Sequence, residues 1–391
     1  MSRRKPVPAL ALAALSLAAA CGSADESSAA PPSDAFATAE LVSPAAASVA
    51  MRVFAPPQPA PTTDERRHLV YELVLANLDP TVALEIVGID VSDADRGTTL
   101  ASLRGTGLAG RFADLSTGDP SDGTTAPGNA VVAFIDLAIS RVVRLPSTLA
   151  HRIVIERGGR VTRIAGPAVP VIGDGARPLG PPLRGGNLLD ANGCCSGAHT
   201  RAVFATSTSL FVSQRFAIDF VRVDDQGTFA GDPTRNESYF LFGAEVIAAG
   251  AGQIIETRDG LPENVPPQLP PFDIETAFGN HVVEALDDGR FVFYGHLATG
   301  SVRVAAGQRV QRGQVLGQVG NTGHADEPHL HFQVTDGPDG FASNGVPYVF
   351  DRLQFQATVD LDADQPVATP VDAPEERRNR LPMTGDIIAF P

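Results

Sequence analysis

Short runs in which hydrophobic and polar residues alternate fill most of the chain from about Ala50 onward. The first group contains the runs "HLVYELVLANL", "LEIVGIDVSD", "NAVVAFIDLAI" and "AHRIVIERG", which clusters of Gly, Pro and Asp separate. Side chains alternate between the two faces of a β-strand, and such clusters favour turns. The spacing of these runs predicts a small immunoglobulin-like β-sandwich over residues 49–172.

A second group of runs follows the Pro- and Gly-rich joint "GDGARPLGPPLRGGN". The segments "FGAEVIAAGAGQIIE" and "VRVAAGQRVQRGQVLGQVGNTG" alternate Val- and Ile-rich strands with glycine-centred turns, and "RFVFYGHL" and "HLHFQV" add further strands. They predict an antiparallel β-domain over residues 183–350, so the expected fold class is all-β. We expect residues 351–391 to form a C-terminal tail that holds an edge strand or clasp.

The first 48 residues have a different composition. Basic "MSRRK" precedes an apolar run that ends at Ala20, which predicts a signal peptide over residues 1–20. The small residues before Cys21 resemble a bacterial lipobox, in which the cysteine is acylated, although ordinary secretory cleavage nearby is the alternative. Residues 21–48 are rich in Ala, Ser and Pro, which predicts a disordered linker. We therefore expect an extracytoplasmic protein that a lipid on Cys21 anchors in the bacterial cell envelope.

Charge and lysine content exclude two classes of function. The formal net charge of −15 argues against binding to nucleic acid or, through charge, to an anionic membrane surface. The Val- and Gly-rich hairpins also resemble biotinyl and lipoyl carrier domains, which need an attachment lysine at the hairpin tip. Lys5 is the only lysine and belongs to the signal segment, so this class is excluded.

The run "EPHLHFQV" contains the first candidate chemistry. On a strand, His329 and His331 share one face, while Leu330 and Phe332 share the other. The first face can therefore hold a metal while the second packs into a core. An exposed polar face without a metal is the alternative for an isolated His-x-His pattern.

Separated segments of the second domain together resemble the LytM and lysostaphin type of zinc peptidoglycan endopeptidases. The aspartate of "QRFAIDFV", then "YGHL", then "GNTGHADEPHLHF" follow the order and spacing of that family over about residues 185–350. The resemblance implies that Asp219 and His331 ligate one Zn²⁺. It also implies that His296 and His329 orient the attacking water and stabilise the tetrahedral intermediate. The expected substrates are the stem or cross-bridge peptides of peptidoglycan.

One position departs from the family pattern. The first histidine ligand of the family lies four residues before the aspartate, where this chain has Arg215. A guanidinium has only donors and stays protonated, so it cannot ligate zinc, and a catalytic zinc normally has three protein ligands. His199 in "NGCCSGAHTRAV" is the nearest replacement; a loop histidine without metal is the alternative. We assign Arg215 and His324, which lies in a polar turn, to substrate binding.

Two questions stay open at the level of the sequence. Cys194 and Cys195 form either a disulfide bond between neighbours or two free thiols. The domain is either a zinc metallopeptidase or a noncatalytic LytM-like module that binds cell wall or regulates another hydrolase. In the second case Arg215 fills the former metal position and pairs with Asp219.

We expect the substitution Cys21→Ser to release the protein from membranes. The substitution removes the acylated side chain, and no other segment of the sequence is long and apolar enough to span a bilayer. The measurement is the distribution of the protein between membrane and soluble fractions. Retention of the variant in the membrane fraction would contradict the lipid anchor.

Overall fold

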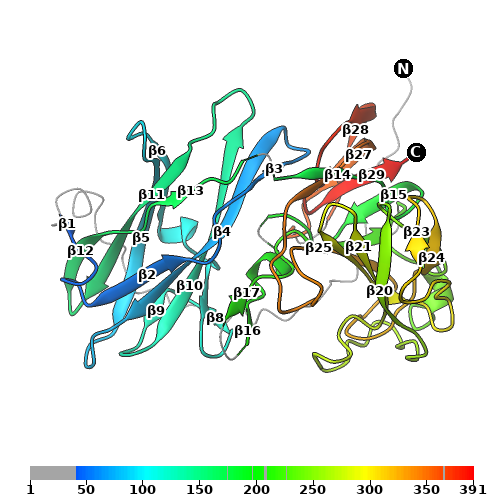
Figure 1. Cartoon of the computed structure of the whole chain (residues 1–391), viewed down its shortest axis with the longest axis horizontal. Coiled ribbons are helices and arrows are strands. Elements are labelled where there is room, and N and C mark those ends of the chain that lie inside the picture. Colours follow the sequence, from blue (N-terminus) through cyan, green and yellow to red (C-terminus); the bar gives the residue numbers. More distant parts are fainter. Residues whose placement is uncertain (1–40, 174, 196, 207–208, 226, 364–365) are drawn as a thin grey trace, which may run out of the picture. The chain divides into compact units, whose positions relative to one another are not determined.

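The computed structural model describes residues 41–391 except 174, 196, 207–208, 226 and 364–365. Its regular elements are β-strands and three short 3₁₀ helices, so the prediction of an all-β fold is confirmed (Figure 1). No helix among the described residues is long and apolar enough to cross a membrane. The predicted signal peptide, Cys21 and most of the predicted linker lie outside the described residues.

The described chain forms two compact units. The sandwich unit contains residues up to 59 and residues 66–175, and the C-terminal unit contains residues 60–65 and 176–391. The chain therefore leaves the sandwich unit briefly at β3 (Pro59–Pro61) and returns to it at β4.

The sandwich unit consists of two sheets in which nearly all neighbouring strands are antiparallel. The first sheet has the order β1 (Leu41–Val42), β12 (Arg160–Ala165), β11 (Thr148–Arg157), β5 (Leu84–Asp93), β6 (Thr99–Arg104), with β13 (Val169–Pro170) beside β11 and β9 (Thr124–Thr125) beside β5. The second has the order β2 (Val49–Val53), β4 (Arg66–Asn77), β10 (Ala130–Ser140), β7 (Phe112–Asp114), β8 (Pro120–Ser121). The helix η1 (Gly105–Gly107) follows β6.

Alternate residues of both sheets form the core of the sandwich unit. Leu69, Tyr71 and Leu73 of β4 lie in one buried cluster with Ile153 and Ile155 of β11. Because side chains of period two share a face, the alternation in these runs is what turns one face of each sheet toward the other. That this sandwich is immunoglobulin-like stays a prediction.

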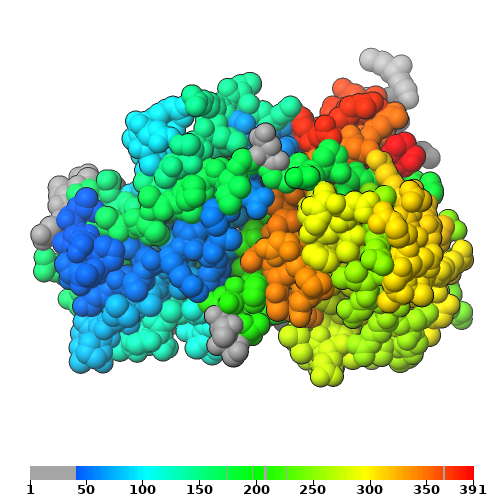
Figure 2. Space-filling view, in the orientation of Figure 1, coloured from blue at the N-terminus to red at the C-terminus, as the bar shows by residue number. Residues whose placement is uncertain are grey.

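The C-terminal unit is built on a ten-stranded sheet whose neighbouring strands are all antiparallel. Its order is β23 (Arg309–Val310), β20 (Gly252–Arg258), β21 (Asn280–Leu286), β22 (Phe291–Leu297), β25 (Leu330–Thr335), β18 (Ile218–Arg222), β15 (Gly185–Asp190), β29 (Asp386–Phe390), β27 (Leu353–Val359), β28 (Ala368–Arg377). Three short pairs accompany it: β14 (Arg177–Leu179) with β26 (Tyr348–Phe350), β16 (Phe204–Ala205) with β17 (Leu210–Phe211), and β19 (Glu245–Ile247) with β24 (Val315–Gln318). The helices η2 (His199–Arg201) and η3 (Asn236–Ser238) lie in its loops. Much of the visible surface of this unit is yellow-green to yellow in Figure 2, the colours of about residues 240–310.

The C-terminal segment belongs to this sheet rather than to a separate tail. The domain predicted from the sequence ends at residue 350, whereas β29 pairs with both β15 and β27 in the interior of the sheet. Ile387 of β29 packs in a buried cluster with Leu189 and Val221. The edge of the sheet is instead β28, whose residues are mostly exposed and include two prolines, as suits an edge.

The strand that carries Asp219 is shorter than the sequence pattern predicts. The run "QRFAIDFV" predicts a strand that includes Arg215 and Asp219 on one face, but β18 begins at Ile218 and residues 213–216 form a turn. The backbone N–H of Ala217 donates to the carbonyl of Gln214, which closes the turn. Arg215 therefore does not share a strand face with Asp219.

We expect Phe332→Ala to lower the free energy of unfolding by about 3–5 kcal/mol, as for other truncations of a buried phenylalanine. Phe332 is fully buried, and its ring contacts Tyr294, Tyr348 and Phe350 at centroid distances of 5.4 to 5.8 Å. Denaturant unfolding of the two proteins measures the difference. A loss below about 1 kcal/mol would show that the apolar face of β25 is not core.

Candidate metal centre

The carboxylate of Asp219 lies at the centre of a buried group of histidines. Its Oδ1 is 2.9 Å from Nδ1 of His331 and 3.6 Å from Nε2 of His329, and its Oδ2 is 3.3 Å from Nε2 of His199. All four side chains are buried. The structure thus brings together residues that are up to 132 positions apart in the chain.

Strand register places two members of this group side by side. In the antiparallel pair of β18 and β25, Asp219 is directly opposite His331, while Ile218 is opposite Phe332 on the apolar face. On the other side of β25, Gly295 of β22 is opposite His331. A Cβ at Gly295 would lie 3.3 Å from the Cβ of His331, so a glycine leaves room for this imidazole.

The backbone at His296 turns its side chain toward the same group. Tyr294 points to the apolar face, and continued strand geometry would send His296 there as well. Instead, His296 has a φ of 59°, in the left-handed region. Its ring lies 4.5 Å from that of His329, measured between centroids. This unusual conformation at a non-glycine residue is typical of functional sites.

Each of the four imidazoles has one ring nitrogen held by an oxygen that can only accept a hydrogen bond. The pairs are His199 Nδ1 with Asn192 O at 2.7 Å, His296 Nδ1 with Thr322 O at 2.7 Å, His329 Nδ1 with Glu327 O at 2.8 Å, and His331 Nε2 with Gln333 Oε1 at 3.0 Å. For His199, His296 and His329 these nitrogens therefore carry the hydrogen. Both nitrogens of His331 face acceptors, and a metal bound at Nδ1 would leave the hydrogen on Nε2. In a neutral ring the opposite nitrogen has a lone pair, and for His199, His329 and His331 that nitrogen is the one nearest Asp219.

The resulting site has several acceptors and few donors. The side-chain amide of Asn192 donates to the carboxylate, with its Nδ2 3.3 Å from Asp219 Oδ2. Lone pairs that face a buried carboxylate are unfavourable unless a positive charge lies among them. One atom each from His199, Asp219 and His331 lies within 4.8 Å of the other two. Two imidazole nitrogens and one carboxylate oxygen at such separations fit a catalytic zinc, whose ligands lie at about 2.0–2.2 Å.

Burial controls the protonation of the site. It lowers the pKa of His199 to about 4, against the opposing effect of Asp219. It also lowers the pKa of His296 well below its usual range, and His329 and His331 add to that shift. Burial alone would raise the pKa of Asp219, but the neighbouring histidines hold it well below its usual range. A neutral His199 and an ionised Asp219 are the forms that bind metals.

The other predicted site residues lie apart from this group. Arg215 is buried in its turn and donates from Nη1 to the carbonyl of Gly345 at 2.8 Å. Substrate binding by Arg215 stays a prediction, and the burial of its side chain does not support it. His324 is half-buried, with Nδ1 bonded to the carbonyl of Pro270 at 2.9 Å and its ring against Phe272. It faces the loop before β21, and its predicted role in substrate binding stays a prediction.

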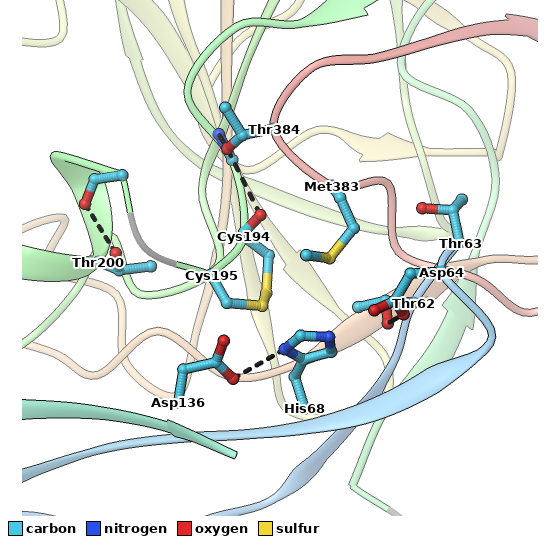
Figure 3. The surroundings of a disulfide bond; sticks show 12 residues. Thr62, Thr63, Asp64, His68, Asp136, Cys194, Cys195, Thr200, Met383 and Thr384 are labelled. Carbon is cyan, nitrogen blue, oxygen red and sulfur yellow. Dashed lines mark hydrogen bonds and ion pairs between the residues drawn. A yellow bond between two sulfur atoms is a disulfide. The ribbon is translucent and has the colours of Figure 1, made fainter. Parts of the chain in front are cut away.

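Cys194 and Cys195 form a disulfide bond, which answers the question that the sequence left open (Figure 3). The backbone N–H and the hydroxyl of Thr384 both donate to the carbonyl of Cys194, and the same hydroxyl accepts from the N–H of Gly193. This loop leads directly to His199. These hydrogen bonds attach the loop to the C-terminal segment, which the sequence pattern predicts to be a tail.

Sequence reasoning missed two side chains of the site. Gln333 follows His331 by two positions and so shares its strand face. The two-residue period of a strand could therefore have indicated it. Asn192 has no comparable signal, because its contacts with His199 and Asp219 depend on how a loop folds back.

Comparison with known proteins relates the C-terminal unit to one peptidase family. Residues 240–344 match the model of peptidase family M23. The cell division protein DipM of Caulobacter vibrioides (strain NA1000 / CB15N) is 36% identical over 124 residues, which are 29% of this chain and 19% of DipM. The chain thus spans less than a fifth of the length of that relative. The match to the M23 model confirms the resemblance to the LytM and lysostaphin type; it includes His296, His329 and His331 and begins after Asp219.

Two solved structures of this type are also similar to the chain. The catalytic domain of lysostaphin from Staphylococcus simulans is 19% identical, with 41% of this chain and 88% of that chain covered and a TM-score of 0.24. The catalytic domain of the prophage-encoded M23 protein EnpA from Enterococcus faecalis, as its A109H mutant, is 20% identical, with 43% and 92% covered and a TM-score of 0.24.

If His199 is a ligand, His199→Ala will weaken zinc binding about as strongly as His331→Ala, because two protein ligands hold a catalytic zinc poorly. His281→Ala is the control, since its ring bonds to Gly279 and Glu256 instead. Zinc content after dialysis, with circular dichroism to verify folding, gives the answer. Full zinc content in His199→Ala would remove His199 from the ligand set.

Proposed function

Because the chain contains a LytM-type domain of peptidase family M23, we propose that it is an exported zinc metalloendopeptidase that hydrolyses peptide cross-links of bacterial peptidoglycan. The observation that carries the proposal is the convergence of His199, Asp219 and His331, which replaces the ligand lost at Arg215. Zinc bound there would lower the pKa of a water molecule and polarise the scissile carbonyl.

The remaining histidines supply proton transfer. Nε2 of His329 bears a lone pair and lies 3.6 Å from Asp219 Oδ1, so it is placed to accept a proton from a water beside that carboxylate. Nε2 of His296 is free in the same way, and its ring lies against that of His329. In our proposal His329 and His296 orient the attacking water and return a proton to the leaving amine.

The setting of this activity is the cell envelope. The predicted signal peptide and the predicted lipid on Cys21 would hold the chain outside the cytoplasm, where peptidoglycan lies. The relative DipM is a cell division protein, and division requires remodelling of the wall, so its likeness to this chain agrees with a substrate in stem or cross-bridge peptides. We keep His324, beside the loop before β21, as a residue that contacts the substrate.

Arg215 supports one alternative function. A noncatalytic module that binds cell wall or regulates another hydrolase would need no metal, and an arginine at the first ligand position suits such a module. Under this alternative the unmodified protein binds no zinc. Under the peptidase proposal it binds zinc, because His199 already completes the site.

We expect His329→Ala to reduce hydrolysis of purified peptidoglycan by at least about 10²-fold, the usual contribution of a general acid or base. The variant should keep its zinc and its unfolding midpoint, since His329 is not one of the three proposed ligands. Release of free amino groups from peptidoglycan measures the rate, with His281→Ala as the control. Equal rates for His329→Ala and the unmodified protein would contradict its role. No hydrolysis by the unmodified, zinc-loaded protein would favour the noncatalytic module.

A further inference from the structure

Gln333 lies behind His331, on the side away from Asp219. It follows His331 by two positions on β25, and its side chain is fully buried. Oε1 of Gln333 is 3.0 Å from Nε2 of His331, and the amide nitrogen donates to the carbonyl of Gly340 at 2.8 Å. The amide thus bridges the imidazole and a loop that follows the strand.

The Gly340 carbonyl fixes which way this amide points. A carbonyl only accepts, so the NH₂ group of Gln333 must face Gly340 and the oxygen must face His331. Gly340 packs so closely against Phe278 that an added Cβ would lie 2.3 Å from that ring. Because the amide oxygen also only accepts, it forms a hydrogen bond with His331 when Nε2 carries the hydrogen, in competition with the Asp219 carboxylate at Nδ1.

We infer that Gln333 is a positioning residue that selects the tautomer of His331 in which Nδ1 is free to bind metal. The inference deepens the proposed function and rests on it, since it assigns a role toward the proposed zinc. In the other tautomer, Nδ1–H of His331 would donate to Asp219 Oδ1, which is only 2.9 Å away. That hydrogen bond would occupy two ligand atoms at once and compete with the metal.

Among the described residues, His331 is the one histidine of this group whose nitrogen away from Asp219 is bonded to a side chain. The corresponding partners of His199, His296 and His329 are backbone carbonyls, which substitution does not remove. The tautomer of His331 therefore depends on the identity of residue 333. A partner of this kind typically changes metal affinity by about 10–100-fold.

The experiment compares three variants of the full chain. Gln333→Met keeps the length of the side chain and removes both hydrogen bonds. Gln333→Glu keeps an acceptor toward His331 and loses the donor toward Gly340, so it separates the two contacts. Gln318→Met is the matched control, because the amide of Gln318 donates to the carbonyl of Gly243 at 3.0 Å, outside the site.

Two quantities are measured. One is the zinc dissociation constant, by competition with a chromophoric chelator. The other is the tautomer of His331 in the metal-free protein at about pH 8, from the ¹⁵N chemical shifts of its ring, where a free imidazole is neutral. The second needs no metal and no variant, so it tests the hydrogen bond directly in the unmodified protein.

We expect the unmodified protein to have the hydrogen on Nε2 of His331. Gln333→Met should move it toward Nδ1 and weaken zinc binding about 10–100-fold, while Gln333→Glu and Gln318→Met stay within several-fold of the unmodified protein. A hydrogen on Nδ1 in the unmodified protein overturns the inference. Unchanged zinc affinity in Gln333→Met also overturns it. A loss of zinc affinity in Gln333→Glu as large as in Gln333→Met overturns it too, because the hydrogen bond to Gly340 would then be the one that matters.

Failure of the proposed function gives a different result. If the unmodified protein binds no zinc, the metal site is wrong, and the tautomer measurement still decides whether Gln333 holds His331. A hydrogen on Nε2 that Gln333→Met displaces and Gln333→Glu retains would support the positioning role without the metal.

Discussion

The C-terminal unit depends on one buried carboxylate that is surrounded mainly by acceptors. Asp219 lies inside the sheet, and ring nitrogens with lone pairs face it at 2.9 to 3.6 Å. A buried negative charge is costly unless a cation or donors compensate it. The register of β18 with β25, the left-handed backbone at His296 and the loop that returns to His199 all aim acceptors at the same point. A bound cation accounts for these features together.

In the proposed site, the ligand composition of the family is kept while one ligand comes from a different part of the backbone. Arg215 stands where the family has its first histidine, but it lies in a turn and bonds to Gly345 rather than on the strand of Asp219. His199 instead reaches Asp219 from the start of η2, and the loop before it is hydrogen-bonded to Thr384 of the C-terminal segment. The donor set of two imidazoles and one carboxylate is the one that the family resemblance implies.

The sequence predicted what periodicity and order along the chain determine. Strand alternation was enough for the all-β fold and for the opposite faces of His331 and Phe332. It could not show that β18 begins only at Ile218, because a turn at Arg215 depends on contacts with Gly345 far along the chain. It also could not place β29 inside the sheet, since the short run that ends at Phe390 reads equally well as an edge strand. The hydrogen bond between Gln333 and His331 could have been predicted from the strand period, because residues two positions apart share a face.

Metal analysis combined with X-ray absorption at the zinc edge tests the central claim most directly. The account predicts one zinc per chain of the purified protein, with nitrogen and oxygen ligands at about 2.0–2.2 Å and imidazole scattering from two histidines. Failure of the protein to retain zinc would contradict the account, and so would a sulfur ligand at about 2.3 Å, which would place the metal at a cysteine instead of at Asp219.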